Sequence, residues 1–268
     1  RKLFKGQFRL FLWLFGKNFL PRKKTITKPF IGNFKINVDT KNFIDACIYF
    51  TGDYEPYLKT NFADLIKPGM VILDVGANIG FHTLYFAELT GKSGKVVAFE
   101  PIDVNFKALQ QNLALNEFPH IMPVNKALGS ENSTLHIHID VNAHNPGAFN
   151  LFENGKKNTS INCVRADDFL KESQISKVDF IKVDVEGFEL EVFKGLAKTL
   201  KQSHPIIFFE YDVNYQLKSQ VDPKEIFYFL SEFAYDFYTI DGYGNRKKLQ
   251  LDASFGSAEI LALPSKQY

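Results

Sequence analysis

Four carboxylates in this 268-residue chain stand at or near the ends of apolar runs: Asp74, Glu100, Asp184 and Glu210. Such runs, rich in β-branched residues, predict strands buried on both faces, and the helical patterns between them predict a mostly parallel α/β sheet. Because the carboxyl ends of parallel strands meet at one edge of the sheet, we expect the four acids to converge there. Acids in such a site could take a proton from a substrate or hold a hard cation.

A glycine turn follows the first of these strands. Residues 71–80 read Val-Ile-Leu-Asp-Val-Gly-Ala-Asn-Ile-Gly, and an amphipathic helix is expected from Gly80 to about Leu89. Glycine permits unusual dihedrals and the close approach of a ligand, and a helix N-terminus offers N–H groups to an anionic group. The spacing is G-x-x-x-G, whereas dinucleotide enzymes carry G-x-G-x-x-G. The pattern predicts a nucleotide-like cofactor, and the alternative is a tight turn without a ligand.

A second buried strand ends in a carboxylate 24 residues after Gly76. It runs from Lys95 to Phe99 and is followed by Glu100 and Pro101. An acid at this place in a βαβ unit accepts hydrogen bonds from ribose hydroxyls. Glu100 is therefore the expected ribose ligand, the alternative being a solvated acid at a strand end.

Composition narrows the class of protein. Hydrophobic residues make up 45% of the chain, enough for a substantial core, and the two cysteines, Cys47 and Cys163, suit neither a disulfide framework nor a zinc site. Reduced thiols in the cytoplasm are the default expectation. Residues 1–28 carry nine Lys or Arg and no acid, whereas the remaining residues carry 23 basic and 30 acidic side chains. That balance disfavours nucleic acid as a partner of the main domain.

The pairing of residues 71–80 with Ala-Phe-Glu-Pro at 98–101 resembles the S-adenosylmethionine-dependent methyltransferases. Further motifs resemble the FkbM family among them: Glu100-Pro101-x-x-x-Asn105-x-x-x-Leu109-x-x-Asn112, Asn125-Lys126-Ala127-Leu128-Gly129 and Asp179-Phe-Ile-Lys-Val-Asp184-Val-Glu186-Gly187-Phe-Glu189. The resemblance runs in order over about residues 52–210. It implies a Rossmann-like class I methyltransferase fold: a seven-stranded, mostly parallel sheet with an antiparallel end, helices on both faces, and an N-terminal helical and strand extension.

The same resemblance implies a cofactor and its contacts. The cofactor would be S-adenosylmethionine, and the product S-adenosylhomocysteine. Asn125, Lys126 and Ala127 would line the adenine, and Tyr54 would lie with Glu55 over the cofactor. From chemistry alone, Glu55 is instead expected to be a surface acid near a helix start. The implied contacts are Glu55, Asp74, Gly76, Ala77, Asn78, Gly80, Thr83, Glu100, Pro101, Asn105, Asn125, Ala127 and Asp184.

FkbM-like enzymes methylate hydroxyl groups, so the resemblance implies O-methylation of a sugar or glycan, a lipid or a secondary metabolite. A neutral alcohol needs a general base or a metal as the new C–O bond forms. The candidate catalytic residues are Asp184, facing the methyl group, with Glu186, Glu210 and His82. No metal is expected, and the alternative is Mg²⁺ held by Asp184 and Glu210. The Asn- and Gly-rich segment 142–159 is expected to recognise the acceptor.

Two other functions remain open. An NAD-dependent oxidoreductase shares the βαβ unit and the ribose acid, but expects the G-x-G-x-x-G loop. A membrane-binding or partner-binding protein could use a methyltransferase-like domain as a scaffold. A nucleic-acid methylase usually carries Asn-Pro-Pro-Tyr or Asn-Pro-Pro-Phe where this chain has Asp-Val-Glu-Gly at 184–187.

The N-terminus predicts a separate element. Over residues 1–20 large apolar side chains cover one wide arc of a helix and basic ones the other, and Pro21 ends the helix. Such a helix suits peripheral contact with an anionic membrane, the alternative being packing on its own domain or on a second copy. The expected organisation is a basic helix and linker (1–28), an extension over the site (29–66) and a methyltransferase domain (67–268). A small-molecule, glycan or lipid-linked acceptor in the cytoplasm is expected, and the oligomeric state is left open.

Overall fold

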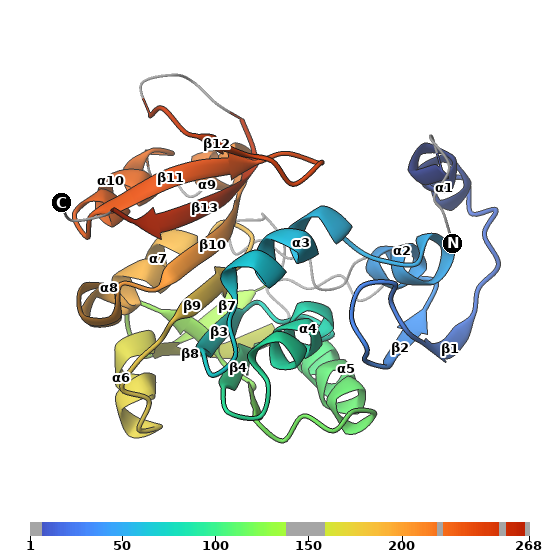
Figure 1. The fold of residues 1–268 in the computed structure, drawn as a ribbon, viewed down its shortest axis with the longest axis horizontal. Coiled ribbons are helices and arrows are strands. Elements are labelled where there is room, and N and C mark those ends of the chain that lie inside the picture. Colours follow the sequence, from blue (N-terminus) through green and yellow to red (C-terminus); the bar gives the residue numbers. More distant parts are fainter. Residues whose placement is uncertain (1–6, 138–158, 219–221, 252–255, 266–268) are drawn as a thin grey trace.

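The computed structural model describes residues 7–137, 159–218, 222–251 and 256–265 (Figure 1). At its centre lies an eight-stranded sheet with the order β12-β11-β13-β10-β9-β3-β4-β5. Its strands are β3 (Val71–Val75), β4 (Lys95–Phe99), β5 (Ile121–Val124), β9 (Phe180–Val183), β10 (Ile206–Tyr211), β11 (Tyr235–Ile240), β12 (Arg246–Lys248) and β13 (Ala258–Pro264).

Five strands, from β5 to β10 in the sheet order, are parallel, and β13 runs opposite to both of its neighbours, β10 and β11. The first strand of the βαβ unit, β3, lies in the interior of the sheet, and the chain moves outward from it in both directions. This is the Rossmann-like class I methyltransferase fold that the sequence predicts. The carboxyl ends of β3, β4, β9 and β10 consequently meet at one edge.

The expected count of seven strands is wrong by one edge strand. β12 pairs antiparallel with the outer side of β11, after a turn in which the Asp241 carboxylate accepts the backbone N–H groups of Tyr243 and Asn245. The three residues of β12 are Arg-Lys-Lys and all are exposed. A strand with neither an apolar run nor alternation gives no periodic signal, and we therefore expected a turn-rich connection there.

Helices cover both faces of the sheet. One face packs against α6 (Ala166–Glu172), α7 (Glu189–Gly195), α8 (Ala197–Ser203) and α10 (Glu225–Ser231). The other face packs against α3 (Pro56–Leu65) and α4 (Phe81–Thr90), with α5 (Asp103–Ala114) beside them. The single helix expected over 186–201 is two helices that meet at Leu196. A short helix, α9 (Val213–Lys218), follows β10.

A small sheet of order β6-β8-β7 flanks the main one. It consists of β6 (Ala127–Gly129), β7 (Ser133–Ile137) and β8 (Thr159–Arg165). The strand expected over 121–127 is broken between β5 and β6, where Asn125 turns the chain from the main sheet into this one. The segment expected to recognise the acceptor, 142–159, lies outside the described residues apart from Thr159.

The N-terminal extension comprises α1 (Gln7–Gly16), β1 (Lys24–Thr27), β2 (Ile36–Asp39) and α2 (Phe43–Thr51). β1 and β2 pair antiparallel. The alternation over residues 30–38 predicts an exposed strand, but only its last part is a strand, as β2. Phe11 of α1 is buried against Ala46 and Cys47 of α2, and its ring lies 6.0 Å from that of Phe43. One side of α1 therefore packs on its own domain. Among the described residues, every helix is too short or too polar to cross a membrane.

Candidate active site

The glycine turn between β3 and α4 takes its shape from two neighbouring elements. Gly76 has φ +82°, and a β-carbon there would lie 1.9 Å from the carbonyl oxygen of Asp184 at the end of β9. Gly80 has φ +88°, and a β-carbon there would lie 2.5 Å from Leu109 of α5. Both positions thus require glycine for packing as well as for the left-handed conformation. Asn78, between them, is also left-handed, with φ +51°.

The side chain of Asp74 holds this turn in position through polar contacts. Its side chain is fully buried; one oxygen accepts the Thr83 hydroxyl at 2.5 Å and the other lies 3.9 Å from the ammonium of Lys182. The contact joins β3 to the first turn of α4. Asp74 and Thr83 are absent from the wall of the cavity described below. Their role in the structure is to position the turn, and direct contact with a cofactor stays a prediction.

Two backbone hydrogen bonds fix the side chain of Glu100, which directly follows β4. Its two oxygens accept the backbone N–H groups of Asn78, at 2.8 Å, and Ile102, at 2.9 Å. Burial raises its pKa to about 7, although these hydrogen bonds and the nearby Asn105 amide act in the opposite direction. The side-chain amide of Asn125 donates to the carbonyl oxygens of Glu100 and Pro101. The carboxylate is therefore oriented by the glycine turn itself, as a ribose ligand must be.

A cavity of about 280 Å³ opens at this edge of the sheet. Its wall includes Glu100 and Pro101 together with the apolar side chains of Leu128, Leu135 and Ile161. The end of the cavity beside β9 and β10 is acidic. The predicted site residues that line the cavity are Gly76, Asn78, Glu100, Pro101, Ala127, Asp184, Glu186 and Glu210. The predicted residues that do not line it are Glu55, Asp74, Ala77, Gly80, His82, Thr83, Asn105 and Asn125.

The acidic end is organised around a buried lysine. Lys182 on β9 is 4% exposed, and its ammonium donates to Asp184 at 3.0 Å and to the carbonyl oxygen of Gly76 at 3.2 Å. Burial raises the pKa of Asp184, but the charge and hydrogen bond of Lys182, with a hydrogen bond from Glu210, outweigh it and hold that pKa below its usual range. The Asp184 charge and then burial raise the pKa of Glu210 well above its usual range. Glu210 is thus the proton donor of the pair and Asp184 the carboxylate.

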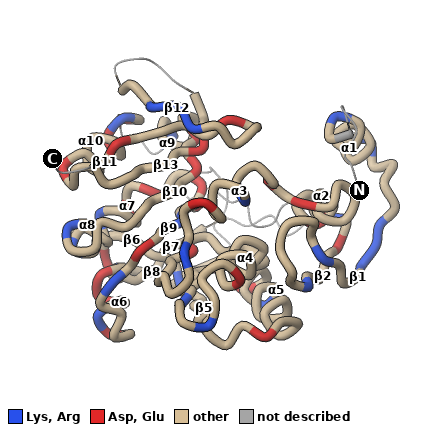
Figure 2. The backbone as a smooth tube through the Cα atoms, viewed as in Figure 1, with Lys and Arg blue, Asp and Glu red and all other residues tan. Residues whose placement is uncertain are grey.

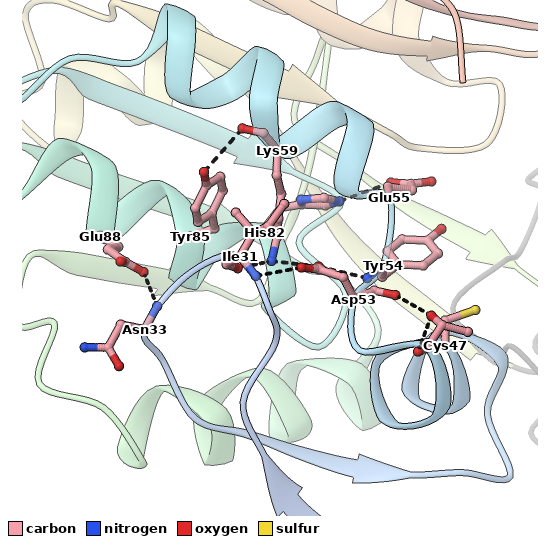
Figure 3. Close-up of polar contacts among 11 residues, drawn as sticks. Ile31, Asn33, Cys47, Asp53, Tyr54, Glu55, Lys59, His82, Tyr85 and Glu88 are labelled. Carbon is pink, nitrogen blue, oxygen red and sulfur yellow. Dashed lines mark hydrogen bonds and ion pairs between the residues drawn. The ribbon is translucent and has the colours of Figure 1, made fainter. Parts of the chain in front are cut away.

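His82 and Glu55 form a pair beside the cavity (Figure 3). The imidazole Nε2 lies 3.2 Å from a Glu55 oxygen, and the ring is buried against Phe62 and Phe81. Burial and then the Glu55 charge raise the pKa of Tyr54, the residue that separates this pair from the cavity. Neither His82 nor Glu55 lines the cavity in this arrangement, whereas Tyr54 does. The expected position of Tyr54 and Glu55 over the cofactor stays a prediction.

Sequence reasoning gave no role to two residues of this region. Lys182 lies within the Phe-Ile-Lys-Val strand, and a lysine in an apolar strand signals a buried partner. Glu259 lies directly opposite Glu210 in the β10–β13 pairing, and burial, followed by the charges of Glu55 and Asp184, raises its pKa to about 8. Nothing local marks Glu259, because its neighbours come from β10, β9 and the segment before α3.

The described residues contain no group of three or more His, Cys, Asp or Glu that could hold a metal ion. Within the described part of the chain, Asp184 and Glu210, the alternative Mg²⁺ ligands, belong to no such group. The sequence places Glu189 in the first turn of a helix, where an acid stabilises the helix dipole, and it is the first residue of α7. Its side chain is 2% exposed, and its oxygens accept the Gly187 N–H and the Gln216 amide.

Comparison with known proteins agrees with this geometry. The model of the methyltransferase FkbM domain matches residues 74–237. The hexuronic acid methyltransferase AglP of Haloferax volcanii is 30% identical over 163 residues, which are 60% of this chain and 62% of that protein. Methyltransferase 1 of Beauveria bassiana is 29% identical over 175 residues, 58% of this chain and 64% of that protein. The chain thus aligns with less than two thirds of the length of these relatives.

Among solved structures, the FkbM methyltransferase of Methylobacillus flagellatus is similar, with a TM-score of 0.46 and 16% identity, over 76% of this chain and 50% of that one. An S-adenosylmethionine-dependent O-methyltransferase of Thermotoga maritima has a TM-score of 0.44 and 14% identity, over 91% of this chain and 78% of that one. On the match of the family model to more than half of its length, the chain belongs to the FkbM methyltransferase family.

Proposed function

We propose that this chain transfers a methyl group from S-adenosylmethionine to a neutral hydroxyl group. The observation that carries the proposal is that a single cavity joins Glu100, oriented by the glycine turn, to the Asp184–Glu210 pair. Glu100 is the ribose ligand, and the Asp184–Glu210 pair can accept a proton. The family supports methyl transfer, and the cavity supports the choice of cofactor and acceptor.

The residues of the cavity fit this cofactor. Ribose hydroxyls can donate to Glu100, whose oxygens keep free lone pairs beyond the two backbone hydrogen bonds. Leu128, Leu135 and Ile161 offer apolar faces for the adenine ring. The acids at the opposite end suit the positive charge of the methionine portion. No described residue fills the space between these two ends.

When bound, the cofactor supplies an electrophilic methyl group on a sulfonium. Asp184 would accept the hydroxyl proton while the oxygen forms its bond to the methyl carbon and the sulfur–carbon bond breaks. The acceptor oxygen becomes strongly acidic as this bond forms, so a carboxylate of low pKa suffices as the base. Lys182 keeps Asp184 ionised before the reaction, and Glu210 holds the orientation of that carboxylate through its hydrogen bond.

The charge of the cavity favours a hydroxyl acceptor over a carboxylate. Three acids, Asp184, Glu186 and Glu210, line the cavity, whereas Lys182 pairs with Asp184 and Lys126 also lines the wall. A carboxylate acceptor would be repelled there and would need no base. We therefore propose a sugar or glycan hydroxyl, or that of a lipid or secondary metabolite, as the acceptor. The relative named for hexuronic acid supports the sugar class. Buried, unpaired Cys47 and Cys163 support a cytoplasmic reaction.

Titration calorimetry with S-adenosylmethionine and S-adenosylhomocysteine tests the cofactor. We expect micromolar binding of both by the wild type. Glu100→Ala should weaken it about a hundredfold or more, because two charge-assisted hydrogen bonds are lost. Asp184→Ala should weaken binding far less than Glu100→Ala, because Glu186 and Glu210 remain in the cavity wall, and the exposed Glu172→Ala is the matched control. Failure of the wild type to bind either compound would refute the proposal.

Methyl transfer from radiolabelled cofactor to neutral sugars and to uronic acids tests the acceptor. We expect labelling of a hydroxyl, and a loss of about 10²-fold or more in kcat for Asp184→Ala. Normal turnover by Asp184→Ala would remove the catalytic assignment. Preferential formation of a methyl ester on a uronic acid would overturn the hydroxyl acceptor.

A further inference from the structure

Exposed apolar side chains are concentrated in the N-terminal extension. Of the eleven large hydrophobic residues that are exposed in the described part of the chain, seven lie between residues 8 and 30. Isolated exposed apolar residues are ordinary, but such a concentration marks an interaction surface. We call these seven the N-terminal surface: Phe8, Leu10, Leu12, Trp13, Phe19, Ile26 and Phe30.

The outward direction of these side chains is fixed by packing. Phe11 and Phe15 hold α1 against α2 through Phe43, with ring centroids 6.0 Å and 5.5 Å from it. Trp13, 55% exposed, and Phe19, 65% exposed, contact each other at 5.8 Å. The helix is therefore anchored by one side, and its remaining apolar side chains point away from the domain.

Basic side chains surround the same residues. Six Lys or Arg between residues 9 and 28 are exposed, and residues 1–28 contain no acid. Figure 2 shows the basic residues of this segment along α1 and β1, at one end of the molecule. Lys24 pairs with Asp39, whereas Arg9, Lys17 and Arg22 form no ion pair with any described residue. Apolar and cationic groups are thus interleaved on one surface.

We propose that the N-terminal surface docks on the surface of an anionic lipid bilayer, with α1 lying in the plane of the membrane. Aromatic side chains can enter the interface between headgroups and acyl chains while Lys and Arg remain with the anionic headgroups. A second copy of the chain fits this surface poorly. In a two-fold dimer the same basic segment would face itself, and like charges in contact are unfavourable.

Docking would bring the cavity close to the headgroups. Phe43 contacts both Phe11 and Phe15 of α1, and it also lines the cofactor cavity together with Ile44. One helix, α2, therefore separates the N-terminal surface from the cavity. This last step rests on the proposed function and favours a lipid-anchored acceptor, whereas binding to vesicles does not depend on it.

Sedimentation with vesicles tests the proposal on the full chain. The probes are vesicles of phosphatidylcholine alone and vesicles in which about a third of the lipid is phosphatidylglycerol. We expect at least about tenfold stronger binding to the anionic vesicles, and a marked loss of binding in about 0.5 M salt. Phe8→Ser/Trp13→Ser/Phe19→Ser should weaken binding about tenfold or more, since three apolar anchors are lost.

The matched control replaces three exposed apolar residues elsewhere, as Leu217→Ser/Tyr228→Ser/Tyr243→Ser, and should bind like the wild type. A wild type that stays in the supernatant with anionic vesicles at low salt would overturn the proposal. Equal binding by the two triple variants would do the same. So would a dimer in solution that Trp13→Ser dissociates, because that result would assign the surface to a second copy.

Discussion

Lys59 and Lys182 are both buried, but the charged groups around the two lysines differ. Lys59 on α3 is fully buried, pairs with Asp53 at 2.9 Å and donates to the carbonyl oxygen of Ile31 at 2.5 Å (Figure 3). Its ammonium also lies 4.1 Å from the centre of the Phe81 ring. Lys182 on β9 instead lies between two carboxylates, Asp74 and Asp184.

The different surroundings shift the pKa values of Lys59 and Lys182 in opposite directions. Burial lowers the pKa of Lys59, and the Asp53 carboxylate, with the charge of Glu88, only partly offsets it. Burial also acts to lower the pKa of Lys182, but the charges of Asp184 and Asp74 outweigh it and raise that pKa. Lys59 joins the N-terminal extension to α3 and α4, so its pair is structural. Lys182 lies among acids that outnumber it, and the surplus negative charge is available for chemistry.

Lys59→Met should have the largest effect on folding. It removes the partner of a carboxylate that is 6% exposed, and breaking a buried ion pair from one side costs about 3–5 kcal/mol. We expect a loss of that size in the free energy of unfolding, measured with urea. The control is Lys24→Met, whose ammonium is 84% exposed in its pair with Asp39 and should cost less than about 1 kcal/mol.

The double variant Lys59→Met/Asp53→Asn separates charge from packing. An asparagine can still accept the Ile31 N–H that Asp53 accepts at 2.9 Å, but leaves no unpaired charge. It should therefore be more stable than Lys59→Met alone. If both variants lose the same stability, the ion pair does not hold the extension to the core.

Glu189→Gln tests the excess of negative charge in the region around Lys182 and Asp184. Burial raises the pKa of Glu189 to about 7, from an ordinary 4.5, and the Asp184 charge adds to the shift. Between these pH values the folded chain holds a proton that the unfolded chain has released, so stability falls as pH rises through this range. The free energy of unfolding of the wild type should fall between about pH 5 and pH 8. In Glu189→Gln this fall should be smaller by about 2–3 kcal/mol.

The control for this prediction lies on the same helix. Burial raises the pKa of Glu191, but hydrogen bonds from Ser130 and Lys194 and the Lys194 charge outweigh it and lower that pKa. Its contribution to stability is lost only as pH falls below the ordinary range of a glutamate. Glu191→Gln should accordingly leave the change between pH 5 and pH 8 as it is in the wild type. An unchanged pH dependence in Glu189→Gln would contradict the assignment of a protonated Glu189.

The residues that the sequence predicted correctly as cavity residues are those that local pattern defines. Gly76, Glu100 and Asp184 directly follow β3, β4 and β9, and Glu210 lies near the end of β10. The topology of a parallel sheet brings these strand ends to one edge. The same logic could not find Glu259, which lies opposite Glu210 on an antiparallel strand far along the chain. Periodicity locates elements, but it does not say which side chains face each other across them.

The N-terminal extension shows the same limit. The strand expected over 30–38 forms only as β2, and β1 lies in a segment expected to be a linker. Lys59 gave no signal either, because its partners, Asp53 and Ile31, come from turns that only the folded chain brings together. The pairing of His82 with Glu55 is likewise tertiary, and it removes from the cavity wall a residue that helix position alone placed beside the reaction.

Lys182→Met would show how much of the Asp184 acidity depends on the lysine. An opposite charge within a few ångströms lowers a carboxyl pKa by about one to three units, and Lys182 lies 3.0 Å from Asp184. We expect the Asp184 pKa to rise by about one to two units, measured by carbon NMR of the carboxyl groups and assigned by comparison with Asp184→Asn. Lys126→Met removes a lysine that lines the cavity wall and is the matched control. If the Asp184 pKa does not move, then the Glu210 hydrogen bond alone keeps Asp184 ionised, and the two buried lysines would both be structural.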